Sequence, residues 1–391
     1  MLSKPLLDES CNELRKKIIN SLEQQGFIIR DGEIFLPESI DKDGIRRIHQ
    51  SAVRAKRERA RKYLEKKESA LLKCFADGRE IDPERIEPRL QEVKSGSWDE
   101  LLFRYSCLHW SIPVSSGYGR RLRFLVYDNS TGKLMGLFGL GDPVFSLSAR
   151  DQWIGWTKED RRKRLVHVMD AFVLGAVPPY NQLLVGKLIA MLVASNEVRE
   201  AYRRKYYDKR SLISGEKQDG QLALITTTSA LGKSSVYNRI KYNDGDDDRV
   251  LYHSVGYTAG SGEFHFSNEL YSEIASFARE HCEPTAKREE WGQGFRNRRE
   301  VIRKVLAAVG LSPKLAYHHV KREVFVVPLA SNAEKFLRGE ENHLDYYDQP
   351  VNLLFDCFRR RWLLPRAKRN NSYLNFRPES LQLWGEGGAN G

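Results

Sequence analysis

Residues 222–266 include the side chains best suited to chemistry. A β-branched run leads into a segment rich in hydroxyl groups, in which Ser235 and Tyr237 could act as nucleophiles. His265 could transfer a proton, and Arg239 could stabilise developing negative charge. No complete catalytic motif surrounds these residues, so the sequence leaves open whether the protein is an enzyme.

Two buried strands are needed to position this segment. The apolar run before Thr228 predicts one strand, and the run before Gly256 predicts another that ends in spaced glycines. Packing alone rarely requires so many small, hydroxyl and glycine residues between two strands. The pattern therefore favours a recognition surface.

A strand–loop–helix pattern precedes this stretch. The apolar run at 165–177 predicts a central strand, and a helix is expected to follow from Asn181. Gly186 lies near the start of that helix, where exposed backbone amides could bind an anion. Before it, the segments 121–127 and 133–140 are predicted to form an antiparallel hairpin.

Positive charge is the strongest compositional signal. The 391 residues include 64 Lys and Arg against 52 Asp and Glu, a net charge of +12. This excess favours a polyanionic partner, DNA first among the nucleic acids. The basic clusters lie beside aromatic residues, which predicts contact with the nucleic-acid backbone rather than base reading. The arginines that we expect at this interface are Arg54, Arg57, Arg61, Arg161, Arg162, Arg164, Arg203, Arg204, Arg296, Arg298, Arg299, Arg360 and Arg361.

Composition also excludes several classes of protein. Hydrophobic residues make up 41% and charged residues 30%, as in globular rather than disordered chains. No run approaches the roughly 20 apolar residues that span a bilayer, and no secretory signal is recognisable. We therefore expect a cytoplasmic protein without a membrane partner. Five scattered cysteines, none in a Cys-x-x-Cys pair, predict free thiols and no metal site.

The chain is predicted to divide into three segments. Residues 1–95 are expected to form a mostly helical basic module, in which Leu14, Ile18 and Leu22 recur at helical spacing before a hairpin. Residues 96–285 are expected to form an α/β core. Residues 286–391 are predicted to be a basic extension of helices and a strand, with a disordered tail.

Three segments, 150–156, 177–190 and 226–266, together resemble one family. The combination is similar to the DruA family of the Druantia antiphage defence system, over roughly residues 95–330. This resemblance implies a role in bacterial antiviral defence beside other Druantia proteins, including a helicase-like subunit. The residues that we assign to this family-motif surface are Trp153, Gly155, Trp156, Tyr180, Gly186, Lys187, Ser234, Arg239, Gly256, Tyr257, Thr258, Gly260 and Gly262.

The order of predicted elements is also similar to the acetyltransferase (GNAT) fold. We therefore predict an α+β protein with a GNAT-like mixed sheet flanked by helices, an N-terminal helical module and a basic C-terminal extension. In that fold the loop before the helix binds the pyrophosphate of coenzyme A. The resemblance thus implies coenzyme A as the cofactor if the protein is an acyltransferase. If the protein is a nucleic-acid-binding component of the defence system, no cofactor is expected.

Three hypotheses follow for the function. The first is a nucleic-acid-binding component of an antiphage defence complex. The second is a coenzyme A-dependent acyltransferase, with Tyr237 or His265 as acid or base. The third is cleavage of a nucleic-acid strand, with Tyr237 as the nucleophile.

Overall fold

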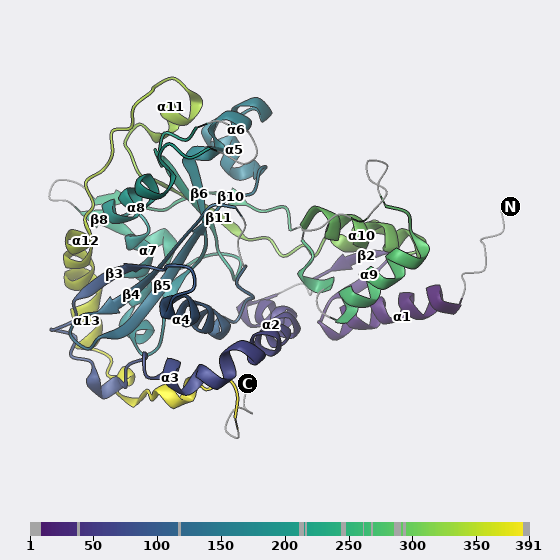
Figure 1. Ribbon diagram of the computed structural model, residues 1–391, viewed down its shortest axis with the longest axis horizontal. Coiled ribbons are helices and arrows are strands. Elements are labelled where there is room, and N and C mark those ends of the chain that lie inside the picture. Colours follow the sequence, from purple (N-terminus) through teal and green to yellow (C-terminus); the bar gives the residue numbers. More distant parts are fainter. Residues whose placement is uncertain are drawn as a thin grey trace. The chain divides into compact units, whose positions relative to one another are not determined.

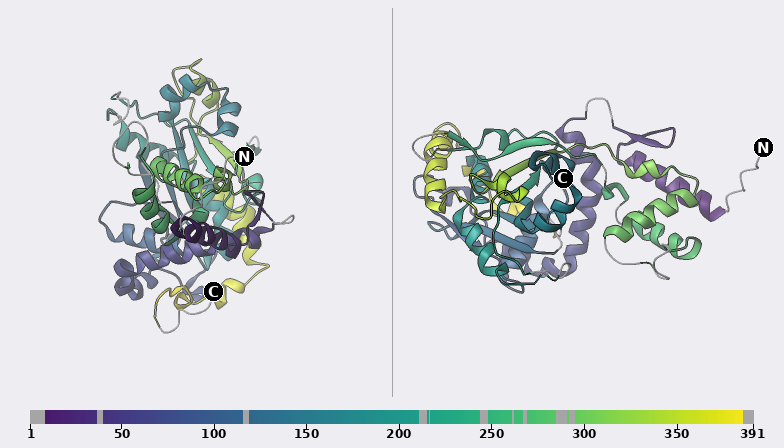
Figure 2. Two further views of the ribbon diagram at one scale, coloured as in Figure 1. Left: turned by 90° about the vertical axis from the view of Figure 1, so that its right-hand side faces the viewer. Right: turned by 90° about the horizontal axis from the view of Figure 1, so that it is seen from above.

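The computed structural model describes residues 9–36, 40–115, 119–210, 215, 217–243, 248–260, 262–266, 269–284, 291 and 295–385. The chain forms two compact units, whose elements are labelled in Figure 1 and seen from two further sides in Figure 2. The small unit comprises Met1–Arg59, Ser111–Pro113 and Ala259–Arg322. The large unit comprises Ala60–Trp110, Val114–Thr258 and Glu323–Gly391.

A mixed sheet of seven strands forms the centre of the large unit, in the order β10-β11-β7-β6-β5-β4-β3. Neighbouring strands are antiparallel except β6 and β7, which are parallel. The strands are β3 (Pro88–Glu92), β4 (Arg121–Asp128), β5 (Lys133–Gly141), β6 (Val168–Ala176), β7 (Leu224–Thr228), β10 (His253–Tyr257) and β11 (Glu323–Pro328).

The two parallel strands part soon after they meet. They pair over Val168–Asp170 of β6 and Leu224–Thr226 of β7. Beyond Asp170, β6 continues beside β5 alone, up to the pairing of Ala176 with Gly136. This parting leaves polar groups of Asp170 and Thr226 at the end of the paired region, where the Thr226 hydroxyl donates to Asp170 at 2.7 Å.

The predicted hairpin is confirmed as β4 and β5. Its strands pair in register, with Phe124 opposite Phe138 and Leu125 opposite Leu137. Because side chains alternate between the faces of a strand, these two pairs enter different cores. Phe124 and Phe138 stack with ring centroids 4.9 Å apart on one face. The predicted central strand at 165–177 is likewise confirmed as β6.

Helices cover both faces of this sheet. One core contains buried side chains of α7 (Val185–Leu192), α8 (Asn196–Tyr206) and α12 (Val351–Phe358). The core on the opposite face contains buried side chains of α3 (Glu68–Leu72) and α4 (Trp98–Ser106). A further cluster joins α5 (Ser148–Ile154) and α11 (Ala333–Arg338) to the sheet, and α6 (Lys158–Arg164) follows α5.

The small unit is mostly helical. It contains α1 (Glu9–Gln24), the hairpin β1 (Ile28–Arg30) and β2 (Glu33–Phe35), α9 (Glu269–His281), α10 (Phe295–Ala308) and the start of α2 (Lys42–Leu64). Leu14, Ile18 and Leu22 of α1 are buried, as their spacing predicts, against side chains of α9 and α10. This core thus joins the start of the chain to residues about 250 positions later.

The compact units cut across the three predicted segments. Helices α9 and α10 share a core with α1, although the prediction placed them in the α/β core and the C-terminal extension. Strand β11, predicted within the extension, lies inside the large sheet between β7 and β10. The apolar face of a helix or strand shows that it is buried, but not which distant element covers it.

The fold class is therefore a mixed α+β structure with a seven-stranded mixed sheet flanked by helices. Among the described residues, no helix is both long enough and apolar enough to cross a bilayer.

Leu188 tests the packing of α7 on the sheet because its side chain is fully buried there. We expect Leu188→Ala to lower the free energy of unfolding by about 2–5 kcal/mol. The matched control is Leu353→Ala on α12, where the side chain is 43% exposed and a change within about 0.5 kcal/mol is expected. Urea denaturation measures both, and equal effects of the two substitutions would contradict this packing.

Candidate functional site

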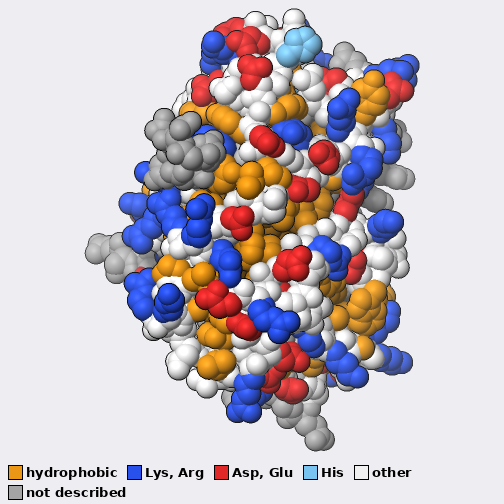
Figure 3. All heavy atoms as spheres, turned by 90° about the vertical axis from the view of Figure 1, so that its left-hand side faces the viewer, with side chains coloured by type: hydrophobic (Ala, Val, Ile, Leu, Met, Phe, Trp, Pro, Cys, Tyr) orange, Lys and Arg blue, Asp and Glu red, His pale blue; other side chains and the backbone are white. Residues whose placement is uncertain are grey.

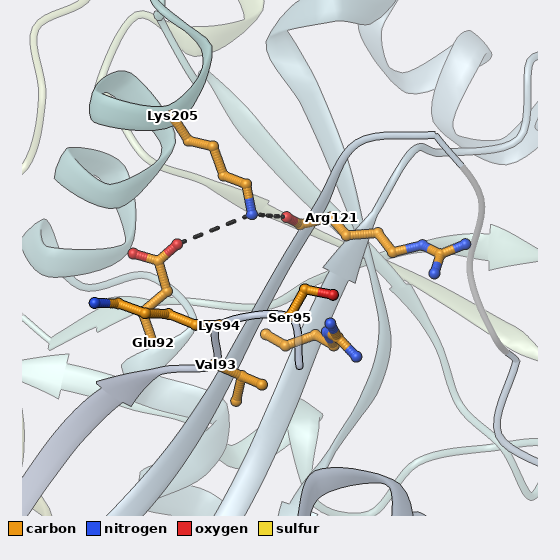
Figure 4. A pocket seen from close by; sticks show the side chains of 7 residues that line it. Glu92, Val93, Lys94, Ser95, Arg121 and Lys205 are labelled. Carbon is orange, nitrogen blue, oxygen red and sulfur yellow. Dashed lines mark hydrogen bonds and ion pairs between the residues drawn. The ribbon is translucent and has the colours of Figure 1, made fainter. Parts of the chain in front are cut away.

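A basic pocket opens at one end of strands β3 and β4 in the large unit. It has a volume of about 270 Å³ and is lined by Glu92, Val93, Lys94, Ser95, Arg121, Arg123 and Lys205. Figure 4 shows Lys205 reaching from α8 toward Glu92 and the backbone of Arg121. The walls therefore carry four cationic side chains and one carboxylate.

The elements around this pocket fix its cations by ordinary strand and helix geometry. Arg121 and Arg123 are two residues apart on β4, so their side chains leave the same face of the strand. The backbone amide of Val93 donates to the carbonyl of Arg123 at 2.8 Å, which holds the loop after β3 against β4. Lys205 lies in the last turn of α8, and its ammonium donates to the carbonyl of Arg121 at 2.8 Å.

Carboxylates offset only part of this positive charge. Glu92 is 2.7 Å from Arg204 and 4.0 Å from Lys205. Arg123 is 2.9 Å from Glu100, a carboxylate that Arg104 also contacts. Burial lowers the pKa of Lys205, Glu92 raises it, and the nearby charges of Arg123 and Lys209 lower it further. The pocket is thus a place where cations crowd one another, and an anion would relieve that repulsion.

A second hollow adjoins the basic pocket along α8. It is lined by Glu200, Arg203, Arg204 and Tyr207. Arg204 connects the two, because its guanidinium binds Glu92 of the basic pocket. The Tyr207 side chain is 60% exposed. This hollow therefore places an accessible aromatic ring beside the cationic pocket.

A second group of cations, which we call the cation cluster, lies at the start of α7. It consists of Lys187, Arg239 of the short helix η6 (Tyr237–Arg239) and Arg361 of the π-helical turn η9 (Arg359–Leu363), together with Trp362. The ammonium of Lys187 is 5.1 Å and the guanidinium carbon of Arg361 is 5.0 Å from the Trp362 ring centroid. Three segments far apart in the sequence thus meet here.

Positive charge crowds Lys187 within the cation cluster. Burial lowers the pKa of Lys187, and the charges of Arg239 and Arg361 lower it further. Within the described ranges, no carboxylate forms an ion pair with Lys187 or Arg239. A side chain added at Gly186 would meet open space, so the first turn of α7 is accessible beside these cations. Such a group of charges favours an anionic ligand.

The loop before α7 is held by the C-terminal part of the chain. Arg366 donates to the carbonyl of Gln182 at 3.0 Å, and the Ser372 hydroxyl donates to the side chain of Gln182 at 2.7 Å. The predicted motif residue Tyr180 is fully buried and donates to Asp128 at 2.8 Å. Its role in the structure is therefore to anchor this loop to the β4–β5 turn.

The hydroxyl-rich segment after β7 is organised by a buried carboxylate. Glu323 accepts from the amide of Ser234 at 2.8 Å and from the hydroxyl of Ser254 at 2.7 Å. The Ser234 hydroxyl in turn accepts from the amides of Val236 and Tyr237. Ser234 thus shapes the turn into η6, whereas Ser235 is exposed.

The environment of Tyr237 favours a packing role. Its ring stacks on Tyr252 with centroids 4.9 Å apart, and its edge meets Phe325. Burial raises the pKa of Tyr237 above its usual range, so the phenol stays protonated near neutral pH. In the described part of the chain, no hydrogen bond joins its hydroxyl to a histidine or carboxylate that could remove the proton.

His265, the third catalytic candidate, belongs to the small unit, whereas Ser235 and Tyr237 belong to the large unit. It is fully buried in the small unit, and its Nε2 lies 2.8 Å from the carbonyl of Leu315. Burial lowers its pKa to about 4, so the imidazole is neutral at pH 7. The structure therefore does not gather Ser235, Tyr237 and His265 within one compact unit.

The two-tryptophan motif is held together by an internal ion-pair network. The fully buried Arg150 binds Asp151 at 2.6 Å, and Arg161 binds the same carboxylate at 2.9 Å. Trp156 is buried, and its indole N–H donates to the carbonyl of Leu337 at 2.7 Å. Trp153 is half-buried within the same apolar cluster. These contacts give the motif residues a structural role in the fold. Gly155 ends α5 in the left-handed conformation that glycine adopts readily.

The glycine-rich motif after β10 is divided between the units. Gly256, Tyr257 and Thr258 belong to the large unit, whereas Gly260 and Gly262 belong to the small unit. A Cβ on Gly260 would lie 2.9 Å from the backbone of His319, and one on Gly262 would lie 2.9 Å from the ring of His318. Close approach of the His319 backbone therefore requires glycine at position 260, whereas at position 262 the near atom belongs to the His318 side chain.

The other predicted arginines are scattered over both units. Arg164 donates to the carbonyl of Phe336, and Arg61 pairs with Glu65. Arg298 and Arg299 both contact the buried carboxylate of Glu263. The remaining ones include Arg54 and Arg57 on α2, the exposed Arg162 on α6 and the exposed Arg360, while the side chain of Arg296 lies outside the described residues.

Sequence reasoning missed several residues of these sites. Lys94, Arg121, Arg123 and Lys205 were not singled out, although the alternation of arginines along a strand was a signal that two of them share a face. Asp170 was also missed. This half-buried carboxyl group lies where β6 and β7 part, and burial raises its pKa to about 6, which makes it a candidate proton acceptor. The available signal was a single acidic residue within the apolar run at 165–177, but it does not show that a second strand ends beside it.

A family model described as "Druantia protein DruA" matches residues 39–339. The chain belongs to the DruA family. A curated DruA protein from Escherichia coli (strain UMEA 4076-1), described in the same words, is 41% identical over 372 residues, which cover 94% of this chain and 91% of that protein. No solved structure matches the chain. The DruA match confirms the resemblance carried by the sequence motifs.

The buried histidines of this DruA-family chain give the small unit a pH dependence. Burial lowers the pKa of both His49 and His265 to about 4, and Arg322, 3.1 Å from His49, opposes its protonation. In the unfolded chain, each imidazole binds a proton near pH 6.5, whereas in the folded chain it does so only near pH 4. The stability that depends on neutral, buried imidazoles is therefore present above pH 6.5 and is lost as the pH falls toward 4. We expect a loss of roughly 2 kcal/mol per histidine at pH 5.

Urea denaturation between pH 7.5 and 4.5 measures this effect. His49→Gln and His265→Gln should each reduce the slope of stability against pH, whereas His281→Gln, at a half-exposed position, should leave it unchanged. If the free energy of unfolding stays level or rises as the pH is lowered from 6.5 to 4.5, these imidazoles are not buried as described.

Proposed function

We propose that the protein acts in Druantia antiphage defence, in the cytoplasm, by binding nucleic acid, DNA first, at the basic pocket. Membership of the DruA family supports the defence role. The observation that carries nucleic-acid binding is that Lys94, Arg121, Arg123 and Lys205 line one preformed pocket. We further propose that other Druantia proteins, including a helicase-like subunit, act together with it.

The distribution of charge supports local phosphate contacts rather than one uniform basic surface. Figure 3 shows a face on which lysine and arginine side chains form separate groups among acidic side chains, around a hydrophobic strip. A local group of cations can contact individual phosphates. Each phosphate that is neutralised releases condensed counterions, which favours binding. Contacts of this kind position a protein on nucleic acid without reading its sequence.

Binding of a labelled oligonucleotide across a salt series tests this proposal. The full chain should bind DNA at low salt and lose affinity steeply as salt rises. The double variant Lys94→Gln/Arg121→Gln should reduce the magnitude of the slope of log affinity against log salt by about 1–2 units, since each phosphate contact contributes roughly 0.7–0.9. Fluorescence anisotropy provides the measurement.

The matched control removes two exposed cations elsewhere in the large unit, by Lys163→Gln and Lys335→Gln. Both lysines form only surface ion pairs in the described part of the chain, with Glu159 and Glu341. The control variant should retain the slope of the unmodified protein. Undetectable binding at low salt, or the same loss in both double variants, would refute binding at this pocket.

A second candidate function, a coenzyme A-dependent acyltransferase, is favoured by the cation cluster. The described order of a hairpin (β4–β5), β6, a glycine-containing helix start, β7, η6 and β10 supports the GNAT-like order predicted from the sequence. Lys187, Arg239 and Arg361 would hold the pyrophosphate beside the open first turn of α7. Asp170, at the parting of β6 and β7, would be the group that accepts a proton.

Thermal unfolding with and without millimolar coenzyme A tests this candidate. A ligand that binds the folded state raises the melting temperature, and this rise should disappear in Lys187→Gln and persist in Lys163→Gln. No rise in the unmodified protein would remove coenzyme A binding from consideration. A rise of the same size in both variants would exclude Lys187 as a contact.

A further inference from the structure

The basic pocket and its neighbouring hollow differ in charge. The pocket carries four cations against Glu92, and one of the four, Arg123, is also paired with Glu100 at 2.9 Å. The hollow is lined by one carboxylate, Glu200, and two arginines, and Arg204 is paired with Glu92 at 2.7 Å. The pocket thus carries more positive charge than the hollow and attracts a phosphate, whereas the less charged hollow suits an uncharged planar group.

Tyr207 is placed to meet such a planar group. It follows the last turn of α8, and its amide is fixed by the carbonyl of Arg203 at 2.9 Å. Gly220 backs it closely, since a Cβ there would lie 3.1 Å from the Cβ of Tyr207. These contacts fix the backbone and Cβ of Tyr207, and with the residue 60% exposed its ring is accessible for stacking.

We propose that the basic pocket holds a phosphate of single-stranded DNA while Tyr207 stacks on an adjacent base. This inference rests on the proposed nucleic-acid binding and names the form of nucleic acid that the site takes. The bases of a duplex are stacked on both faces, so a protein ring gains a base face only where the strand is single or opened. The size of the pocket, about 270 Å³, suits part of one nucleotide.

The test compares a single-stranded oligonucleotide with a duplex of the same sequence at one low salt concentration, using the full chain. Tyr207→Ala should weaken single-strand binding by about 5- to 100-fold, the loss of one base stack. It should change duplex binding little. Tyr207→Phe keeps the ring and should bind the single strand like the unmodified protein. Melting temperatures check that both variants are folded.

An oligonucleotide with abasic positions separates stacking from charge. It should bind the unmodified protein more weakly than the intact strand does, and Tyr207→Ala should cause little further loss. Unchanged single-strand binding by Tyr207→Ala, or an equal loss on the duplex, overturns this inference while leaving salt-dependent DNA binding intact. Absence of binding to both DNA forms at low salt overturns the proposed function, and this inference with it.

Discussion

The position of strand β11 is the constraint on which much of this structure depends. It lies between β7 and β10 in the sheet, although the chain forms β10 first and returns as β11 only at Glu323. The segment Ala259–Arg322 between these two adjacent strands belongs to the small unit. The small unit thus combines an insertion between neighbouring strands with an N-terminal segment of similar length. Glu323, the first residue of β11, also fixes the turn at Ser234 and the edge strand at Ser254.

Local elements could be predicted from the sequence, whereas their partners could not. The alternation in β4 and β5 and the helical spacing of Leu14, Ile18 and Leu22 identified real elements, because each pattern arises from one strand or helix. The pairing of β11 with β7 joins segments about 100 residues apart, and the shared core of α10 and α1 joins segments nearly 300 residues apart. No local periodicity records them, so the predicted domain boundaries follow chain order and the compact units do not.

The candidate sites show the same limit. Arg203, Arg204, Lys187, Arg239 and Arg361 were singled out as basic or motif residues, but the sequence could not show which cations meet. In the structure, Arg204 joins the basic pocket through Glu92, and Lys187, Arg239 and Arg361 meet near Trp362. Several motif residues, including Ser234, Trp156 and Gly260, instead satisfy hydrogen bonds or close packing. A motif can thus mark a demanding local fold as readily as a reactive site.

Hydrogen exchange of the full chain, with and without a single-stranded DNA oligonucleotide, tests most directly whether the basic pocket binds nucleic acid. Backbone amides of residues 92–95, 120–123 and 200–207 line or adjoin the pocket and its hollow. DNA should slow exchange in these three segments together, and the protection should fall as salt rises. Protection confined to other segments, with these three unchanged under conditions where DNA is bound, would contradict the proposed site.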